Sequence, residues 1–162
     1  MNVGSQGAAP ERRTALLPEP TATQRVYLEL LRTHEAFETA AARFFKGYGV
    51  TGQQFNVLRI LYVRAHEAGI PCSAIAGRLL NRVPDMTRLL DRLERAGLVS
   101  RARCAEDRRV VRAQLTAEGV ALVERIHAPL LAFHDDLAGS LSGDEARQLV
   151  RLLERARAEP SK

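Results

Sequence analysis

The spacing of apolar residues changes twice along this 162-residue chain, and that change limits the possible folds more than any other feature. From residue 21 to residue 96 and again from residue 116, apolar side chains recur every three or four positions, which is typical of amphipathic helices. Two short β-prone runs, 98–103 and 110–115, lie between these regions and are joined by a polar link. The pattern predicts a mainly α-helical protein with one small β-hairpin.

Capping motifs mark where the long helices begin. Thr21, Thr51 and Ser142 each precede a Gln or Glu by three residues, and Thr116 stands directly before the helical pattern resumes. Residues 1–20 lack periodicity and are expected to form a flexible tail. We expect helices over 21–46, from 51 to about 69, over 71–80 and 84–96, and two more between 116 and 157.

Composition excludes several classes of protein. Hydrophobic residues make up 46% of the chain and charged residues 27%, which is ordinary for a globular protein. No apolar run approaches the roughly 18 residues of a membrane span, and the N-terminus does not resemble a signal peptide. Two cysteines are too few for a disulfide framework, so a cytoplasmic protein is expected. No nucleophile–base set or phosphate-binding glycine loop is present, so we expect neither an enzyme nor a bound cofactor.

The positive charge is concentrated in one segment. Residues 78–112 contain ten arginines and five acidic residues, so this segment carries the whole net charge of +5. Such clustering indicates a polyanionic partner.

The segment begins with two short helices joined by a tight turn at 81–83, the arrangement of a helix-turn-helix. At about 100° per residue, Met86, Leu89, Leu90 and Leu93 share the face toward the core. The opposite face and its edges carry Pro84, Thr87, Arg88, Asp91, Arg92 and Arg95. On this outer face an exposed arginine can bind guanine through two hydrogen bonds, and threonine can contact a thymine methyl group or a phosphate.

Two alternatives apply to these charges. Asp85 either complements the helix dipole or accepts a hydrogen bond from cytosine. The whole face could also be a solvated surface with pairs such as Asp91 to Arg95. The tight turn before the helix and the basic hairpin after it favour binding to DNA.

The hairpin adds a second basic element. Its tip carries Asp107, Arg108 and Arg109, and its flanks carry Arg101, Arg103 and Arg112. A two-stranded ribbon beside a recognition helix can reach the minor groove, where an arginine senses groove width through the negative potential. We expect Asp107 to orient one of the neighbouring arginines through a salt bridge.

These residues resemble a known family. Asp107-Arg108-Arg109, followed by Leu115-Thr116 and Gly119, is similar to the wing signature of the MarR-type winged helix-turn-helix regulators. The run from Thr87 to Glu94 and then Gly97-Leu98-Val99 resembles the recognition helix and first wing strand of that family.

The resemblance implies a homodimer that binds a pseudo-palindromic operator in double-stranded DNA, most often as a repressor. It also implies one domain over 21–162, with a winged helix-turn-helix lobe at about 52–116 and dimerisation helices at about 21–46 and 117–157. The wing arginine of the family falls on Arg109, and its recognition-helix contacts fall on Thr87, Arg88 and their neighbours. The full set of expected DNA-binding residues is Arg82, Pro84, Asp85, Thr87, Arg88, Arg92, Arg95, Arg108 and Arg109.

Many members of the family also bind a small, often aromatic, effector. The candidate lining residues for such a pocket are Phe44, Phe45, Tyr48, Phe55, Tyr62 and His66. The aromatic residues among them could instead be ordinary core. If the effector carries a carboxylate, Arg32 or Arg59 could pair with it.

Other functions remain as alternatives. Cys104, beside the wing arginines, could make the chain redox-responsive, and His127 with His134 could bind zinc with help from Glu124 or Asp135. A basic winged helix could also dock an acidic protein instead of DNA.

Overall fold

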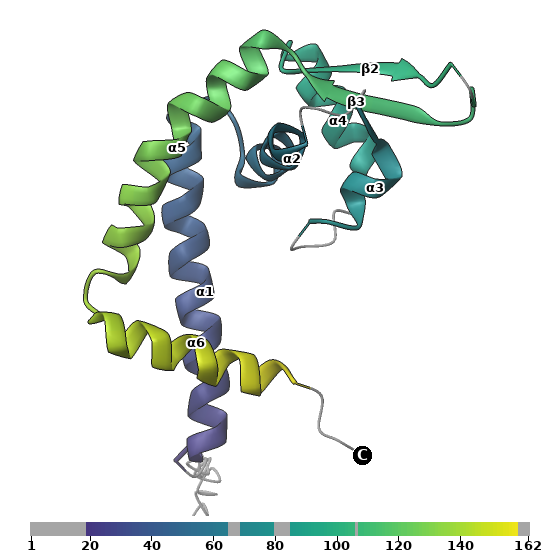
Figure 1. Cartoon of the computed structure of the whole chain (residues 1–162). Coiled ribbons are helices and arrows are strands. Elements are labelled where there is room, and N and C mark those ends of the chain that lie inside the picture. Colours follow the sequence, from purple (N-terminus) through teal and green to yellow (C-terminus); the bar gives the residue numbers. More distant parts are fainter. Residues whose placement is uncertain (1–18, 65–68, 80–84, 106, 159–162) are drawn as a thin grey trace, which may run out of the picture. The chain divides into compact units, whose positions relative to one another are not determined.

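The computed structural model describes residues 19–64, 69–79, 85–105 and 107–158 (Figure 1). Two compact units divide the chain, one ending at Ala36 and the other beginning at Phe37. No helix in the described ranges combines the length and the hydropathy that crossing a lipid bilayer requires.

The long helices begin where the capping motifs predicted. They are α1 (Ala22–Lys46), α2 (Gly52–Val63), α5 (Ala117–Ala138) and α6 (Gly143–Arg157). Ahead of α2, the Thr51 hydroxyl accepts from the Gln54 N–H at 3.2 Å, and the Gln54 side chain accepts from the Thr51 N–H at 2.8 Å. Thr21 and Ser142 form the same reciprocal pairs with Gln24 and Glu145. These bonds satisfy N–H groups that have no partner inside a helix.

The helix-turn-helix contains α3 (Cys72–Ala76) and α4 (Met86–Arg95). The prediction of a helix over 71–80 was too long, because Pro71 belongs to a strand and the helix ends at Ala76, before its C-cap Gly77. Helix α4 begins at Met86, two residues later than expected, since Asp85 is its N-cap. Arg82 and Pro84, both expected to bind DNA, lie outside the described residues, as does the predicted turn at 81–83.

The predicted hairpin is confirmed as β2 (Val99–Arg103) and β3 (Val111–Leu115). Its antiparallel register pairs Val99 with Leu115 and Arg103 with Val111. A third strand, β1 (Ile70–Pro71), was not predicted; it pairs with the other edge of β3, giving the order β1-β3-β2. Figure 1 shows the β2–β3 ribbon extending past the helices as a wing.

One hydrophobic core holds the lobe together. The side chains of α4 that were expected to face inward do so: Leu89, Leu90 and Leu93 are buried, and Met86 is half-buried against them. They pack with Leu58 of α2 and Ile126 of α5, both of which have no exposed surface. Burying the inner face of α4 fixes which of its residues remain on the outside.

Candidate nucleic-acid interface

The outer surface of α4 is basic. Thr87, Arg88, Arg92 and Arg95 are all exposed, as the helical spacing predicted. An α-helix of this width fits the major groove of B-form DNA, where exposed arginines reach base edges. The surface therefore has the shape and chemistry of a recognition helix.

Asp85 binds the main chain and the side chain of one residue. Its Oδ1 accepts from the Arg88 N–H at 2.9 Å, which caps α4, and its Oδ2 lies 2.9 Å from Arg88 Nε. The carboxylate also stands at the positive end of the helix dipole.

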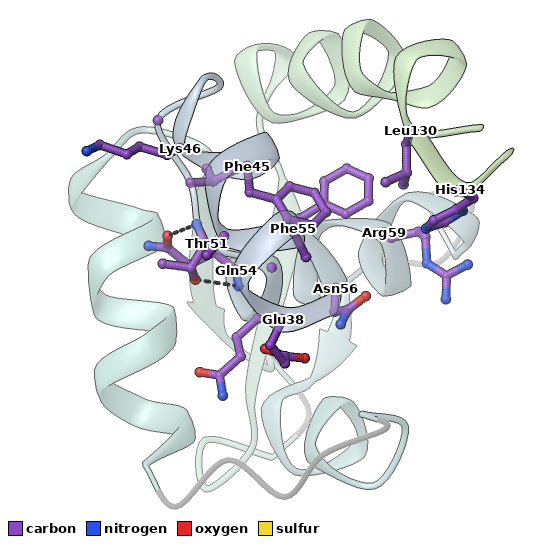
Figure 2. Close-up of a pocket in the computed structure, with 16 residues that line it drawn as sticks. Glu38, Phe45, Lys46, Thr51, Gln54, Phe55, Asn56, Arg59, Leu130 and His134 are labelled. Atoms are coloured by element: carbon purple, nitrogen blue, oxygen red, sulfur yellow. Dashed lines mark hydrogen bonds between the residues drawn. The ribbon is translucent and has the colours of Figure 1, made fainter. Parts of the chain in front are cut away.

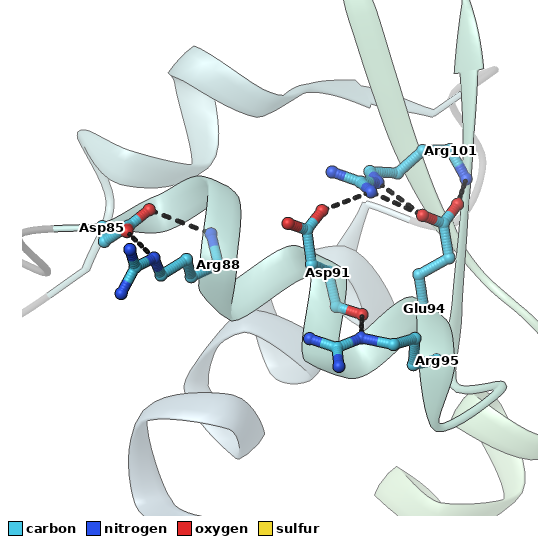
Figure 3. A network of polar contacts seen from close by, with 6 residues as sticks. All are labelled: Asp85, Arg88, Asp91, Glu94, Arg95 and Arg101. Carbon is cyan, nitrogen blue, oxygen red and sulfur yellow. Dashed lines mark hydrogen bonds and ion pairs between the residues drawn. The ribbon is translucent and has the colours of Figure 1, made fainter.

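A three-residue ion network joins α4 to the wing (Figure 3). Arg101 of β2 donates from Nη2 to Asp91 and to Glu94 at 2.5 Å each, and from Nε to Glu94 at 2.9 Å. Its main-chain N–H donates to Glu94 at 3.1 Å. The Arg101 side chain is only 22% exposed, so this network attaches the recognition helix to the first wing strand.

The network corrects one expectation. The Asp91 carboxylate pairs with Arg101 and not with Arg95, whose Nε instead donates to the Asp91 main-chain oxygen at 3.2 Å. Arg101 is therefore a structural residue of the lobe. Arg112 is also engaged, because its Nη1 donates to the Gly69 carbonyl at 2.8 Å.

The charges of the network shift its titration. Hydrogen bonds from Arg101 hold the pKa of the Glu94 carboxyl below its ordinary value, and hydrogen bonds to Glu94 and Asp91 raise the pKa of Arg101. Both groups are thus more firmly charged in the folded protein than in isolation.

The tip of the wing is a tight turn that presents two arginines. The Val110 N–H donates to the Asp107 carbonyl at 2.9 Å, which leaves Arg108 and Arg109 as the central, exposed residues. The Asp107 carboxylate accepts from the Arg109 main-chain N–H at 2.9 Å and so shapes the turn itself. The salt bridge expected between Asp107 and a guanidinium stays a prediction.

A cavity of about 810 Å³ lies beside α2 (Figure 2). Phe45 near the end of α1, Phe55 and Arg59 of α2, and Leu130 and His134 of α5 are among its lining residues. A second cavity of about 570 Å³ shares four of these residues, all but Phe45.

The second cavity is mainly apolar and has polar groups at its edge. Tyr62 and His127 line it, and the Tyr62 hydroxyl donates to Glu124 Oε1 at 3.1 Å. That hydrogen bond and the nearby negative charge raise the pKa of the Tyr62 phenol. The bond also links α2 to α5 across the edge of the cavity.

Only three of the aromatic residues proposed for an effector pocket line either cavity. Phe45, Phe55 and Tyr62 line the cavities, and Phe45 and Phe55 are also buried core. Phe44 and Tyr48 line neither cavity; Phe44 stacks on Phe133 with ring centroids 4.7 Å apart and contacts Tyr48 at 5.2 Å. The sixth candidate, His66, lies outside the described residues.

His127 and His134 both line the second cavity, together with Glu124. Across the described ranges, however, no three His, Cys, Asp or Glu side chains are grouped so that they could hold a metal ion.

Exposed arginines on α4, a preceding helix packed against the same core and a basic hairpin define a winged helix-turn-helix DNA-binding protein. The model of the MarR family matches residues 50–111, which span α2 to the start of β3. The homoprotocatechuate degradative operon repressor of Escherichia coli is 30% identical over 127 residues, covering 78% of this chain and 84% of that protein.

Solved structures agree with this match. A MarR transcription factor from Planctomyces limnophilus is 37% identical, covers 83% of this chain and 97% of that chain, and has a TM-score of 0.65. The MepR–DNA complex of Staphylococcus aureus is 28% identical, covers 85% of this chain and 97% of that chain, and has a TM-score of 0.70. The chain belongs to the MarR family of DNA-binding transcriptional regulators.

Proposed function

We propose that the chain binds a pseudo-palindromic operator as a homodimer, represses transcription there and is released by a small aromatic effector. The observation that carries the proposal is the pairing of two exposed basic elements, the outer face of α4 and the Arg108–Arg109 tip of the wing. The helix suits the major groove and the tip suits the adjacent minor groove.

Apolar surface supports the homodimer. In the N-terminal unit, Val26 and Tyr27 of α1 are 55% and 63% exposed, and Leu30 and Leu31 follow one turn later on the same face. On α6, Leu149, Val150 and Leu152 are also exposed, and the helix buries none of its residues. Exposed apolar stripes of this kind are typical of protein interfaces. A twofold axis would place two recognition helices about 34–36 Å apart, one turn of DNA.

Two substitutions test the DNA-binding residues. The probe is a duplex selected by the wild-type protein from a random-sequence pool, compared with a shuffled duplex. We expect Arg109→Ala to weaken binding to both duplexes and to reduce the slope of log K against log salt, since a positive charge near the backbone is lost. We expect Arg88→Ala to cost about 1–3 kcal/mol more on the selected duplex than on the shuffled one, because a base contact is lost.

The control is Arg147→Ala, which removes an exposed arginine of α6 that pairs with Asp144. Its affinity and salt slope should match those of the wild type. Selected-duplex affinity that survives both Arg88→Ala and Arg109→Ala would disprove these assignments. A wild-type protein that binds no duplex at low salt, but does bind an acidic protein, would favour the alternative of a protein-interaction module.

The second cavity supports release by an effector. Its volume of about 570 Å³ suits a small molecule, and apolar walls with Arg59 and two histidines suit an aromatic ring that carries an acidic group. An occupant there would lie between α2 of the DNA-binding lobe and α5. Such a molecule can shift the protein off DNA only if it prefers one spacing of these helices over another.

Benzoate and phenol test this assignment, since they share a ring and differ in charge. We expect benzoate to release the selected duplex from the wild-type protein, and Arg59→Gln to raise the benzoate concentration required by about tenfold, because a charge-assisted hydrogen bond is lost. The effect of phenol should not change. Equal sensitivity of Arg59→Gln and wild type to benzoate would rule out Arg59 as the carboxylate partner.

A further inference from the structure

Asp85 differs from the other acidic residues of the recognition helix in the partner it binds. Asp91 and Glu94 turn toward Arg101, on the side of α4 that faces the wing strand. The Asp85 carboxylate instead binds Arg88, a residue of the outer face, through both its N–H and its Nε (Figure 3). The Arg88 side chain is 79% exposed, so this contact orients a guanidinium that stands in solvent.

We propose that Asp85 is a positioning residue that sets DNA sequence specificity through Arg88. The inference rests on the proposed function, in which Arg88 contacts a base. A free arginine side chain samples many rotamers, and fixing it on DNA costs entropy. An ion pair already present in the unbound protein restricts the guanidinium before DNA arrives, so less freedom is lost when the base contact forms.

The geometry of the ion pair is compatible with base recognition. Asp85 Oδ2 forms its ion pair with Nε of Arg88, at 2.9 Å, and Nε is one of the three guanidinium nitrogens. The two terminal amino groups can therefore donate to O6 and N7 of a guanine while the Asp85 contact persists. A fixed guanidinium plane also penalises base pairs that do not present two acceptors in that plane.

The carboxylate has an opposite effect on general affinity. A negative charge at the DNA surface is repelled by phosphates whatever the sequence, so Asp85 weakens binding to every duplex. Asp85 nevertheless strengthens discrimination between sequences, because its orienting effect on Arg88 is favourable only on a duplex where Arg88 contacts its base. Removing the charge should consequently lower the ratio of selected-duplex to shuffled-duplex affinity.

Asp85→Asn isolates this effect from helix capping. The amide oxygen of asparagine can still accept from the Arg88 N–H, and asparagine is as good an N-cap as aspartate, so the helix should stay intact. The lost exposed ion pair lowers the affinity ratio about threefold per half-site, which is about tenfold for a dimer. Binding to the shuffled duplex should be unchanged or tighter, most clearly at low salt. Asp85→Ser, which also keeps a capping oxygen without the charge, should behave alike.

Two comparisons decide the mechanism. Asp144→Asn removes a similar i,i+3 pair, Asp144 with Arg147 at 2.6 Å on α6, and should leave the affinity ratio at the wild-type value. In an Arg88→Ala background, Asp85→Asn should cause no further fall in the ratio, because its partner is already absent.

Either of two results overturns the proposal. One is an affinity ratio that does not change in Asp85→Asn or Asp85→Ser while the wild type still prefers its selected duplex. The other is an equal fall in the Arg88→Ala background, which would mean that Asp85 contacts the DNA directly. A wild-type protein that shows no preference for any duplex counts against the proposed function instead.

Discussion

Gly119→Ala is expected to lower the free energy of unfolding by about 3 kcal/mol, because the first turn of α5 touches the backbone before β2. A Cβ at this position would lie 2.1 Å from the Leu98 carbonyl oxygen and 3.0 Å from Leu115 Cδ2. Overpacking costs about 1–3 kcal/mol and more when backbone must move. The better helix propensity of alanine offsets about 1 kcal/mol of that cost. Urea unfolding at fixed protein concentration measures the loss.

The matched control is Gly77→Ala. A Cβ on Gly77 would meet no atom within 4 Å, and its backbone is in the right-handed helical region, with φ at −69°. We expect this variant to unfold within about 0.5 kcal/mol of the wild type, as is usual for surface changes. Equal stability of Gly119→Ala and Gly77→Ala would show that α5 does not sit this close to the Leu98 carbonyl.

The second large effect is expected for Arg101→Met. Methionine keeps a long side chain but leaves the carboxylates of Asp91 and Glu94 without their shared guanidinium partner. An exposed ion pair contributes up to about 1 kcal/mol to stability, whereas loss of one partner of a buried pair costs about 3–5 kcal/mol. Because this network is half-buried, we expect the free energy of unfolding to fall by about 2 kcal/mol. Selected-duplex affinity should also fall, because the recognition helix and the wing lose an attachment.

The pH dependence of unfolding identifies the cause of that loss. Since the folded pKa of Glu94 lies below its ordinary value of 4.5, its contribution to stability is fully present above that value. It is lost as the pH falls through the folded pKa. The stability difference between wild type and Arg101→Met should therefore be largest near neutral pH and shrink in acid.

Arg103→Met provides the comparison, since Arg103 is an exposed residue of the same strand. The free energy of unfolding of Arg103→Met should be close to that of the wild type at every pH. If Arg101→Met is no less stable than Arg103→Met at neutral pH, the network does not stabilise the lobe.

Local sequence signals predicted most of the helices and the hairpin correctly. A helix begins where a capping side chain accepts a hydrogen bond from an N–H group three residues later. The N-caps Thr51 and Ser142 could therefore be predicted from the sequence, without knowledge of the fold. Strand β1 was missed because Ile70 and Pro71 are too few to show alternation, and only pairing with β3 defines them.

The candidate site was partly predictable for the same reason. Helical periodicity alone placed Arg88, Arg92 and Arg95 on the surface of α4. The role of Arg101 was not predictable, because its partners lie seven and ten residues away and meet it only when β2 folds back beside α4.

The sequence by itself determined the order of elements, the inner face of α4 and the basic character of its outer face, since each depends on residues that are neighbours along the chain. Tertiary structure decided which arginines are engaged inside the lobe and which aromatic residues line a cavity. The charge of an arginine or the ring of a phenylalanine does not specify which residue it contacts. Packing decides this, because it brings Arg101 to two carboxylates and places Phe44 against Phe133.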